Sequence, residues 1–213
     1  VSAFGYQGQK CSACSRVIAH QKIHDELLEK VIERTKKLKI GPAWEQASNV
    51  ACVAEKSGYE NILGYIETGR SEGECVLGGG PAKVKGVNGY YIQPTIFSGI
   101  KKKHRVHCEE IFGPVLSLIY MDTIDDAIAL ANSGRYGNMA CLFTRSGAAA
   151  RKFRYEAQIG NIGINLGVAA PMAFFPFSGW KDSFFGDMHG QGRDAVEFFT
   201  QKKVVVERWP KAT

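Results

Sequence analysis

The segment Gly5-Tyr6-Gln7-Gly8-Gln9-Lys10-Cys11-Ser12-Ala13-Cys14-Ser15-Arg16 is the most informative part of this sequence. It places a cysteine behind two glycines, which favour a sharp backbone turn because they carry no side chain. The residues after the cysteine are predicted to begin a helix, whose first amides would stabilise a thiolate and a developing oxyanion. The segment therefore predicts that Cys11 is a nucleophile that attacks a carbonyl carbon.

Other roles are open for the pair formed by Cys11 and Cys14. A Cys-x-x-Cys motif also occurs in redox sites and as half of a zinc site, and most cysteines are simply buried in a core. The sequence has no second Cys-x-x-Cys motif, which argues against a structural zinc site, and no βαβ unit precedes the pair. We interpret Cys14 as a structural residue.

The composition is that of an ordinary globular domain. Hydrophobic residues make up 45% of the 213 residues and charged residues 23%, which argues against extended disorder. The sequence shows no apolar run of membrane-spanning length and no signal-peptide pattern. Six scattered cysteines are more typical of a reducing compartment than of a disulfide framework. We therefore predict a cytoplasmic or organelle-matrix protein without membrane partners.

The net charge of +6 raises the possibility of an anionic partner. The most basic run, Lys101-Lys102-Lys103-His104-Arg105, contains no interleaved aromatic residue and matches no nucleic-acid-binding motif. We interpret this run as a solvated turn between two strands and predict no nucleic-acid partner.

Helical and strand-like segments alternate along the chain. Apolar spacing and capping residues predict helices from Asp25 to Gly41, from Ser57 to Gly69, from Thr123 to Gly134 and over residues 148–158. Short apolar runs predict strands over residues 75–77, 90–97, 115–121, 139–144 and 161–165. This alternation predicts an α/β fold with a mostly parallel sheet that helices cover on both faces.

The last part of the chain contains a long loop and an apolar run. The loop over residues 167–192 is rich in Gly, Pro and Phe, and loops of this length usually line a site. Residues 196–208 include Val204-Val205-Val206 and are predicted to form one extended strand. Because an exposed strand edge tends to pair with another chain, we expect a homo-oligomer.

Four motifs in this order resemble the NAD(P)-dependent aldehyde dehydrogenase superfamily. They are Gly8-Gln9-Lys10-Cys11, Glu109-Glu110-Ile111-Phe112-Gly113-Pro114-Val115, Tyr136-Gly137-Asn138 and Pro176-Phe177-Ser178-Gly179-Trp180-Lys181-Asp182-Ser183. The resemblance covers essentially the whole chain. It implies a three-layer α/β catalytic domain over residues 1–193 and a C-terminal oligomerisation strand and tail over residues 194–213, in a dimer or tetramer.

The resemblance also implies a chemistry. Cys11 would attack an aldehyde, and the thiohemiacetal would pass a hydride to NAD or NADP. Water or coenzyme A would then cleave the resulting thioester. Glu110 would hold the nicotinamide ribose and Phe112 would pack beside the nicotinamide, whereas on their own these two residues would be a solvated carboxylate and a core aromatic. The substrate would be bound by Gln9, Lys10, Phe177 and Ser178.

Several parts of this enzyme family are expected outside the chain. In the family the Gly-rich cofactor segment, the glutamate general base and the oxyanion asparagine all precede the cysteine. Here the first residue is Val1, and an active-site loop is normally presented by preceding structure. We therefore expect the chain to be the C-terminal part of a longer protein whose cofactor-binding domain lies upstream.

Two subfamilies share the resemblance. Residues 7–16 and 91–95 look like Δ1-pyrroline-5-carboxylate dehydrogenase, whereas residues 143–153 and 171–181 are similar to methylmalonate-semialdehyde dehydrogenase, which uses coenzyme A. The second resemblance covers the predicted substrate loop and is favoured. Both imply a semialdehyde that carries a carboxylate. A third possibility is a non-catalytic module that keeps the fold for oligomerisation alone.

Overall fold

A four-stranded sheet forms the centre of the computed structural model, which describes residues 1–211. The order of its strands is β1 (Arg16–His20), β4 (Val115–Met121), β3 (Thr95–Ser98) and β2 (Glu74–Leu77). The first three run parallel, and β2 is antiparallel to β3. The prediction of a mostly parallel sheet in an α/β fold is confirmed.

Helices cover both faces of this sheet. Helix α1 (His24–Lys36) packs on the face that contains Leu116 and Leu118. Helices α2 (Lys56–Glu72) and α4 (Ile124–Ser133) pack on the opposite face. Strand β4 is therefore buried on both sides, which explains why its sequence is a nearly continuous apolar run.

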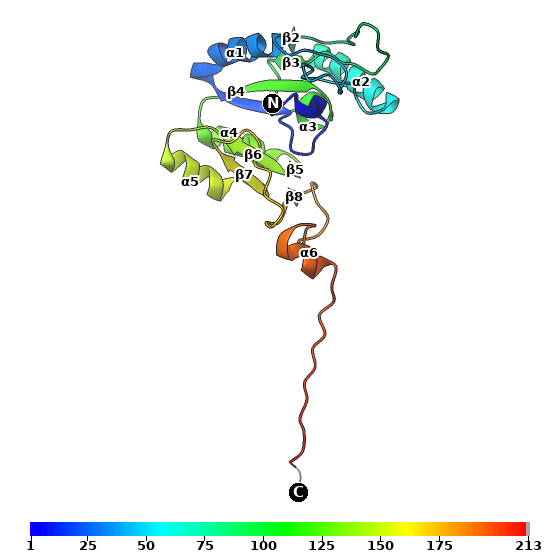
Figure 1. Ribbon diagram of the computed structural model, residues 1–213. Coiled ribbons are helices and arrows are strands. Elements are labelled where there is room, and N and C mark those ends of the chain that lie inside the picture. The colour runs from blue at the N-terminus through cyan, green and yellow to red at the C-terminus, as the bar shows by residue number, and fades with distance from the viewer. Residues whose placement is uncertain (212–213) are drawn as a thin grey trace.

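A second, smaller part lies below the sheet in Figure 1. Strands β6 (Met139–Leu142) and β7 (Asn161–Ile164) pair in parallel. Helix α5 (Gly147–Glu156) supplies Phe153 to the small core that this part shares with α4. Within residues 1–211, no helix combines the length and the apolar character needed to cross a membrane.

Two of the predicted helix starts can be compared with the structure directly. The hydroxyl of Thr123 accepts a hydrogen bond from the Asp126 amide (3.1 Å), which caps α4 as predicted. The predicted capping box at Ser57 is wrong, because α2 already begins at Lys56 and its preceding residue, Glu55, makes no side-chain cap. The apolar face of α2 therefore predicted the helix correctly, whereas the capping pattern did not predict its first residue.

The strand predicted over residues 90–97 is shorter in the structure. Only Thr95–Ser98 forms β3, and the preceding part makes a single bridge from Ile92 to Pro81. Pro94 explains the interruption, because proline has no amide hydrogen to donate to a neighbouring strand.

The strand predicted over residues 196–208 is wrong in its first part. Residues Gly192–Phe198 form helix α6 instead. Residues 200–211 then run away from the domain in an extended form and pair with no strand of the described chain (Figure 1). Residues 212 and 213 of the predicted tail lie outside the described residues.

A buried histidine makes the stability of the fold depend on pH. His107 lies in helix α3 (Arg105–Cys108), is 5% exposed, and its carbonyl accepts a hydrogen bond from Arg16 (2.9 Å). Burial, followed by the charges of Arg16 and His104, lowers the pKa of His107 from 6.5 to about 4. The folded state therefore keeps this imidazole neutral.

We expect acid to destabilise the protein through His107. Between pH 6.5 and about pH 4 the unfolded state binds a proton that the folded state does not, so stability falls as the pH falls. Between pH 7 and pH 4.5, a shift of this size corresponds to a loss of about 2 kcal/mol in the free energy of unfolding. Urea unfolding at pH 7 and pH 4.5 measures it, and a His107→Gln variant should lose clearly less. An equal loss in both proteins would assign the acid sensitivity to other groups.

Candidate active site

Cys11 lies exposed on a turn just after the short 3-10 segment Gly5–Gly8. Tyr6, Gln7 and Gly8 have φ values of 52°, 58° and 69°, so three successive residues adopt the left-handed conformation. Such a run is costly for residues with a side chain and persists only where surrounding structure holds it. The turn is therefore a constrained feature, in agreement with a site that presents one side chain.

The helix predicted to follow Cys11 is absent from this position. The chain makes a tight turn, in which the Ala13 amide donates to the Lys10 carbonyl (2.9 Å), and then enters strand β1 at Arg16. The β-branched pair Val17-Ile18 is compatible with a strand, and the pairing with β4 decides it. The proposed stabilisation of a thiolate by a helix start is thus wrong, and the turn itself must position the thiol.

The Cys11 turn packs against the Glu109–Val115 motif through two glycines. A methyl group on Gly8 would clash with the carbonyl oxygen of Gly113, and a methyl group on Gly113 would clash with Ile62 of α2. Both positions are buried. Two motifs about 100 residues apart are therefore in direct backbone contact, as a shared site requires.

The two neighbouring glutamates of that motif have different surroundings. Glu109 receives two hydrogen bonds from Arg105 (3.0 Å each) and one from the Tyr65 hydroxyl (2.6 Å), and these donors lower the pKa of Glu109 to about 2. Within residues 1–211, the exposed Glu110 carboxylate makes no hydrogen bond or ion pair. Glu109 thus stabilises the end of α3, and Glu110 is available to a ligand.

Phe112 is held in an unusual position. Its φ is 55°, a conformation that an aromatic residue rarely adopts, and the residue is 46% exposed. A large apolar ring that is strained and half exposed does not serve core packing. Its position next to Gly113 places the ring on the same segment that contacts the Cys11 turn.

Gln9, predicted to bind substrate, makes an internal contact. Its side-chain oxygen accepts a hydrogen bond from the Ala54 amide (3.2 Å). This bond joins the Cys11 turn to the segment before α2. The neighbouring Lys10 is exposed, and its ammonium lies 5.3 Å from the centre of the Tyr6 ring, a cation–π distance.

Asn138 connects the Cys11 turn to the smaller part of the fold. It lies between β5 (Tyr136–Gly137) and β6, and its amide nitrogen donates to the carbonyl of Cys11 (2.7 Å). Asn161, which is buried, donates in turn to the carbonyls of Asn138 (3.0 Å) and Ser178. Three of the four motifs identified in the sequence are therefore linked by hydrogen bonds.

The comparison with known proteins identifies the family. Residues 1–205 match the model of the aldehyde dehydrogenase family. The chain belongs to this family. It is 43% identical to malonate-semialdehyde dehydrogenase 2 of Bacillus thuringiensis (strain Al Hakam) over 212 residues, which cover 99% of the chain and 43% of that protein.

Two solved aldehyde dehydrogenase structures match the fold. The methylmalonate-semialdehyde dehydrogenase of Oceanimonas doudoroffii superposes with a TM-score of 0.95 at 37% identity, over 99% of the chain and 44% of that protein. The NAD-bound 1-pyrroline-5-carboxylate dehydrogenase from Thermus superposes with a TM-score of 0.79 at 38% identity, over 85% of the chain and 35% of that protein. The chain thus spans less than half the length of each relative.

The six cysteines of this aldehyde dehydrogenase chain divide by exposure. Burial raises the pKa of Cys14 and that of Cys141, so neither is suited to act as a thiolate. The Cys14 thiol also donates a hydrogen bond to the Arg16 carbonyl (3.3 Å), in agreement with a structural role. The exposed thiols are Cys11, Cys52 and Cys108.

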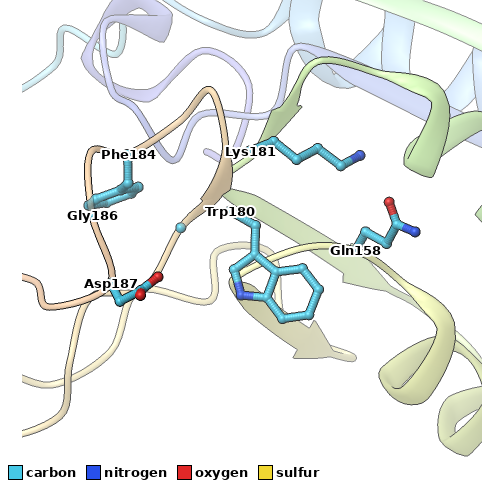
Figure 2. A pocket seen from close by; sticks show the side chains of 7 residues that line it. Gln158, Trp180, Lys181, Phe184, Gly186 and Asp187 are labelled. Atoms are coloured by element: carbon cyan, nitrogen blue, oxygen red, sulfur yellow. The ribbon is translucent and has the colours of Figure 1, made fainter.

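One cavity, of about 370 Å³, lies against the Cys11 turn and is lined by Lys10, Ser12 and Ala13 among others. A larger one lies beside the fourth motif. It measures about 610 Å³, and Figure 2 shows the Trp180 ring between Asp187 on one side and Gln158 on the other. The Lys181 ammonium donates hydrogen bonds to the carbonyls of Asn132 (2.6 Å) and Gly134 (3.0 Å). It therefore caps the C-terminal end of α4. Cys11 does not line this cavity.

The position of the candidate site stays a prediction, and the structure adds two residues next to it, Asn138 and Asn161, for which no role was predicted from the sequence. Asn138 was part of a motif without a role, and Asn161 looked like an ordinary strand residue. Ser178 is joined to the Cys11 turn through these two asparagines, while the half-buried Phe177 packs 5.9 Å from Phe184 between ring centres. No set of three or more His, Cys, Asp or Glu side chains among residues 1–211 is placed to hold a metal ion.

Proposed function

We propose that this chain is the catalytic part of an aldehyde dehydrogenase that oxidises a semialdehyde bearing a carboxylate, with malonate or methylmalonate semialdehyde as the favoured substrates. The observation that carries the proposal is the exposed Cys11, held on a strained turn against the segment that contains Glu110 and Phe112. The similarity to malonate-semialdehyde dehydrogenases over 99% of the chain supports it.

In this proposal the Cys11 thiolate attacks the aldehyde carbon, a C–S bond forms, and the carbonyl electron pair moves to oxygen. When the C=O bond re-forms, the C–H bond breaks and a hydride leaves, which oxidises the carbon to a thioester. Water or the thiol of coenzyme A then attacks the thioester, and Cys11 leaves as a thiolate. The exposure of Cys11 gives a substrate access to the sulfur.

A nicotinamide cofactor would accept the hydride, and two residues are suited to hold part of it. The carboxylate of Glu110, which makes no hydrogen bond or ion pair within residues 1–211, can accept hydrogen bonds from both hydroxyls of a ribose. The exposed ring of Phe112 can cover a flat heterocycle and exclude water from the hydride path. The NAD in the Thermus 1-pyrroline-5-carboxylate dehydrogenase structure favours NAD for this chain.

Lys10 is the residue we assign to the substrate carboxylate. It precedes the nucleophile and is exposed, so its ammonium can pair with an anionic group on an aldehyde bound at Cys11. Phe177 and Ser178 would border the same substrate. The side-chain oxygen of Gln9 already accepts a hydrogen bond from the Ala54 amide. Gln9 would therefore contribute to substrate binding indirectly, by holding the Cys11 turn in place.

A chimera tests this function. The chain alone should produce no NADH from malonate semialdehyde, since hydride transfer needs a complete cofactor site. Fused behind the part of the Bacillus thuringiensis enzyme that precedes the matched region, it should oxidise this semialdehyde with NAD and coenzyme A. A folded but inactive chimera, or robust NADH production by the chain alone, would contradict the proposal.

The same assay tests the alternative substrate. The 38% identity to the Thermus 1-pyrroline-5-carboxylate dehydrogenase favours 1-pyrroline-5-carboxylate, in its ring-opened semialdehyde form, as the second candidate. A chimera that prefers this compound and ignores coenzyme A would establish that alternative. A chimera without activity whose Cys11 is also unreactive would favour a non-catalytic oligomerisation module.

We also propose that the C-terminal segment pairs with another chain. Val204, Val205 and Val206 are 86%, 64% and 92% exposed, an apolar run without cover in the described chain. A β-branched run with free backbone groups is suited to strand pairing. A homodimer or tetramer in the cytoplasm or an organelle matrix is the expected assembly.

We expect Val205→Pro to dissociate this assembly. Proline removes one backbone donor and should disrupt the paired strand. Light scattering should give an oligomer for the wild type and a smaller species for the variant. Lys211→Pro, beyond the apolar run, should leave the mass unchanged. A monomeric wild type, or an oligomer unaffected by Val205→Pro, would place the interface elsewhere.

A further inference from the structure

We propose that Asn138 is a positioning residue for the Cys11 nucleophile, and that Asn161 couples this pair to the substrate loop at Ser178. The inference rests on the proposed role of Cys11 and goes beyond it, because it assigns the part of the molecule that holds the nucleophile in place.

The contact between Asn138 and Cys11 is direct. The Asn138 amide nitrogen donates to the Cys11 carbonyl at 2.7 Å, across 127 residues of sequence. A carbonyl can only accept, so this position requires a donor. Leucine has a similar size but no donor, and aspartate has a similar shape but would place an oxygen against the Cys11 oxygen.

The second contact holds Asn138 itself. Asn161 is buried, and its side-chain amide donates to the carbonyls of Asn138 and Ser178. The Asn161 backbone amide also donates to the Asn138 carbonyl (3.0 Å). A buried amide with all these partners is fixed in orientation. One network therefore extends from the substrate loop to the carbonyl of the nucleophile.

The consequence for Cys11 follows from geometry. Gly8 is held behind the turn by its contact with Gly113, and Asn138 fixes the carbonyl of Cys11. With both ends fixed, the direction of the Cys11 side chain is set, and the thiol stays exposed to a reagent. The backbone of the turn therefore sets how far the sulfur is open to a reagent, and alkylation of a cysteine depends on thiolate fraction and access. Asn138 should therefore control the reactivity of Cys11.

The test measures thiol reactivity rather than turnover. In the 213-residue chain, Cys11 alkylation by iodoacetamide is followed by mass spectrometry over about pH 6 to 9, with Cys52 of the same sample as reference. Asn138→Leu and Asn138→Asp should each lower the Cys11 rate by about fivefold or more and alter its pH profile. The Cys52 rate should stay constant.

Asn132→Leu is the matched control. The Asn132 side chain donates to the Glu156 carbonyl (2.9 Å) and accepts from the Gln158 amide (2.7 Å), so it holds backbone as Asn138 does, but away from the Cys11 turn. This variant should lose stability and keep the Cys11 rate within about twofold of the wild type. Circular dichroism verifies that each variant is folded.

The outcomes separate the two proposals. If wild-type Cys11 reacts no faster than Cys52 and Cys108, the assignment of the nucleophile fails. If Cys11 is the fastest thiol but Asn138→Leu and Asn138→Asp leave its rate and pH profile unchanged, the positioning role fails and the nucleophile stands. An equal loss in Asn132→Leu would reduce the effect to general stability and overturn the inference.

Discussion

In the active chimera, Cys11→Ala should lower the rate of NADH formation by about 1,000-fold or more. Alanine removes the sulfur that forms the bond to the aldehyde carbon, and the described residues place no second exposed thiol on the Cys11 turn. Binding of NAD, measured by fluorescence quenching, should remain, because Glu110 and Phe112 are unchanged.

Cys14→Ala and Cys52→Ala are the controls for this loss. Cys14 is half-buried with a raised pKa, and Cys52 is exposed outside the turn. Both variants should keep the rate of NADH formation within about tenfold of the unmodified chimera, with the larger effect at Cys14 through packing. A Cys11→Ala chimera that retains activity while Cys52→Ala loses it would assign the nucleophile to Cys52.

Gly8→Ala should destabilise the chain by about 3 kcal/mol. The new methyl group would clash with the Gly113 carbonyl, which is main chain and cannot rotate away, and φ at Gly8 is 69°. Urea unfolding measures the loss, and Cys11 alkylation in the same variant should slow, because the turn must move away from the Gly113 segment.

Gly64→Ala gives the opposite result and serves as the matched control. Gly64 lies inside α2, and apart from its chain neighbours and the nearby helix backbone no described atom lies within 4 Å of an added methyl group. Alanine should stabilise the helix by up to about 1 kcal/mol. If Gly8→Ala were as stable as the wild type, the close packing of the Cys11 turn on the Gly113 segment would be wrong.

The parts of the fold predicted correctly are those with one strong local signal. The run Val115–Met121 forms β4 with the predicted bounds, because a strand buried on both faces must be continuously apolar. Thr123 caps α4 through the expected bond to Asp126. In contrast, residues 196–198 were predicted to start a strand but form the end of α6. Over so few positions, alternating apolar residues are compatible with a helix or a strand.

The candidate site was predicted residue by residue, but its connections were not. Cys11, Glu110 and Phe112 stand in motifs that carry a chemical meaning on their own. The bond from Asn138 to Cys11 spans 127 residues, and no local pattern reports a contact over that distance. The strand that follows Cys11 was missed because a glycine turn can precede either a helix or a strand, and only the sheet partner β4 decides.

If Cys11 is the nucleophile, its sulfur carries the acyl group during turnover. Rapid acid quenching of the chimera with malonate semialdehyde and NAD, before coenzyme A is added, allows the covalent intermediate to be located by peptide mass spectrometry. We expect an acyl group on the peptide that contains Cys11, and its loss when coenzyme A is added. An acyl group on Cys52 or Cys108, or NADH formation without any acylated cysteine, would show that Cys11 is not the nucleophile.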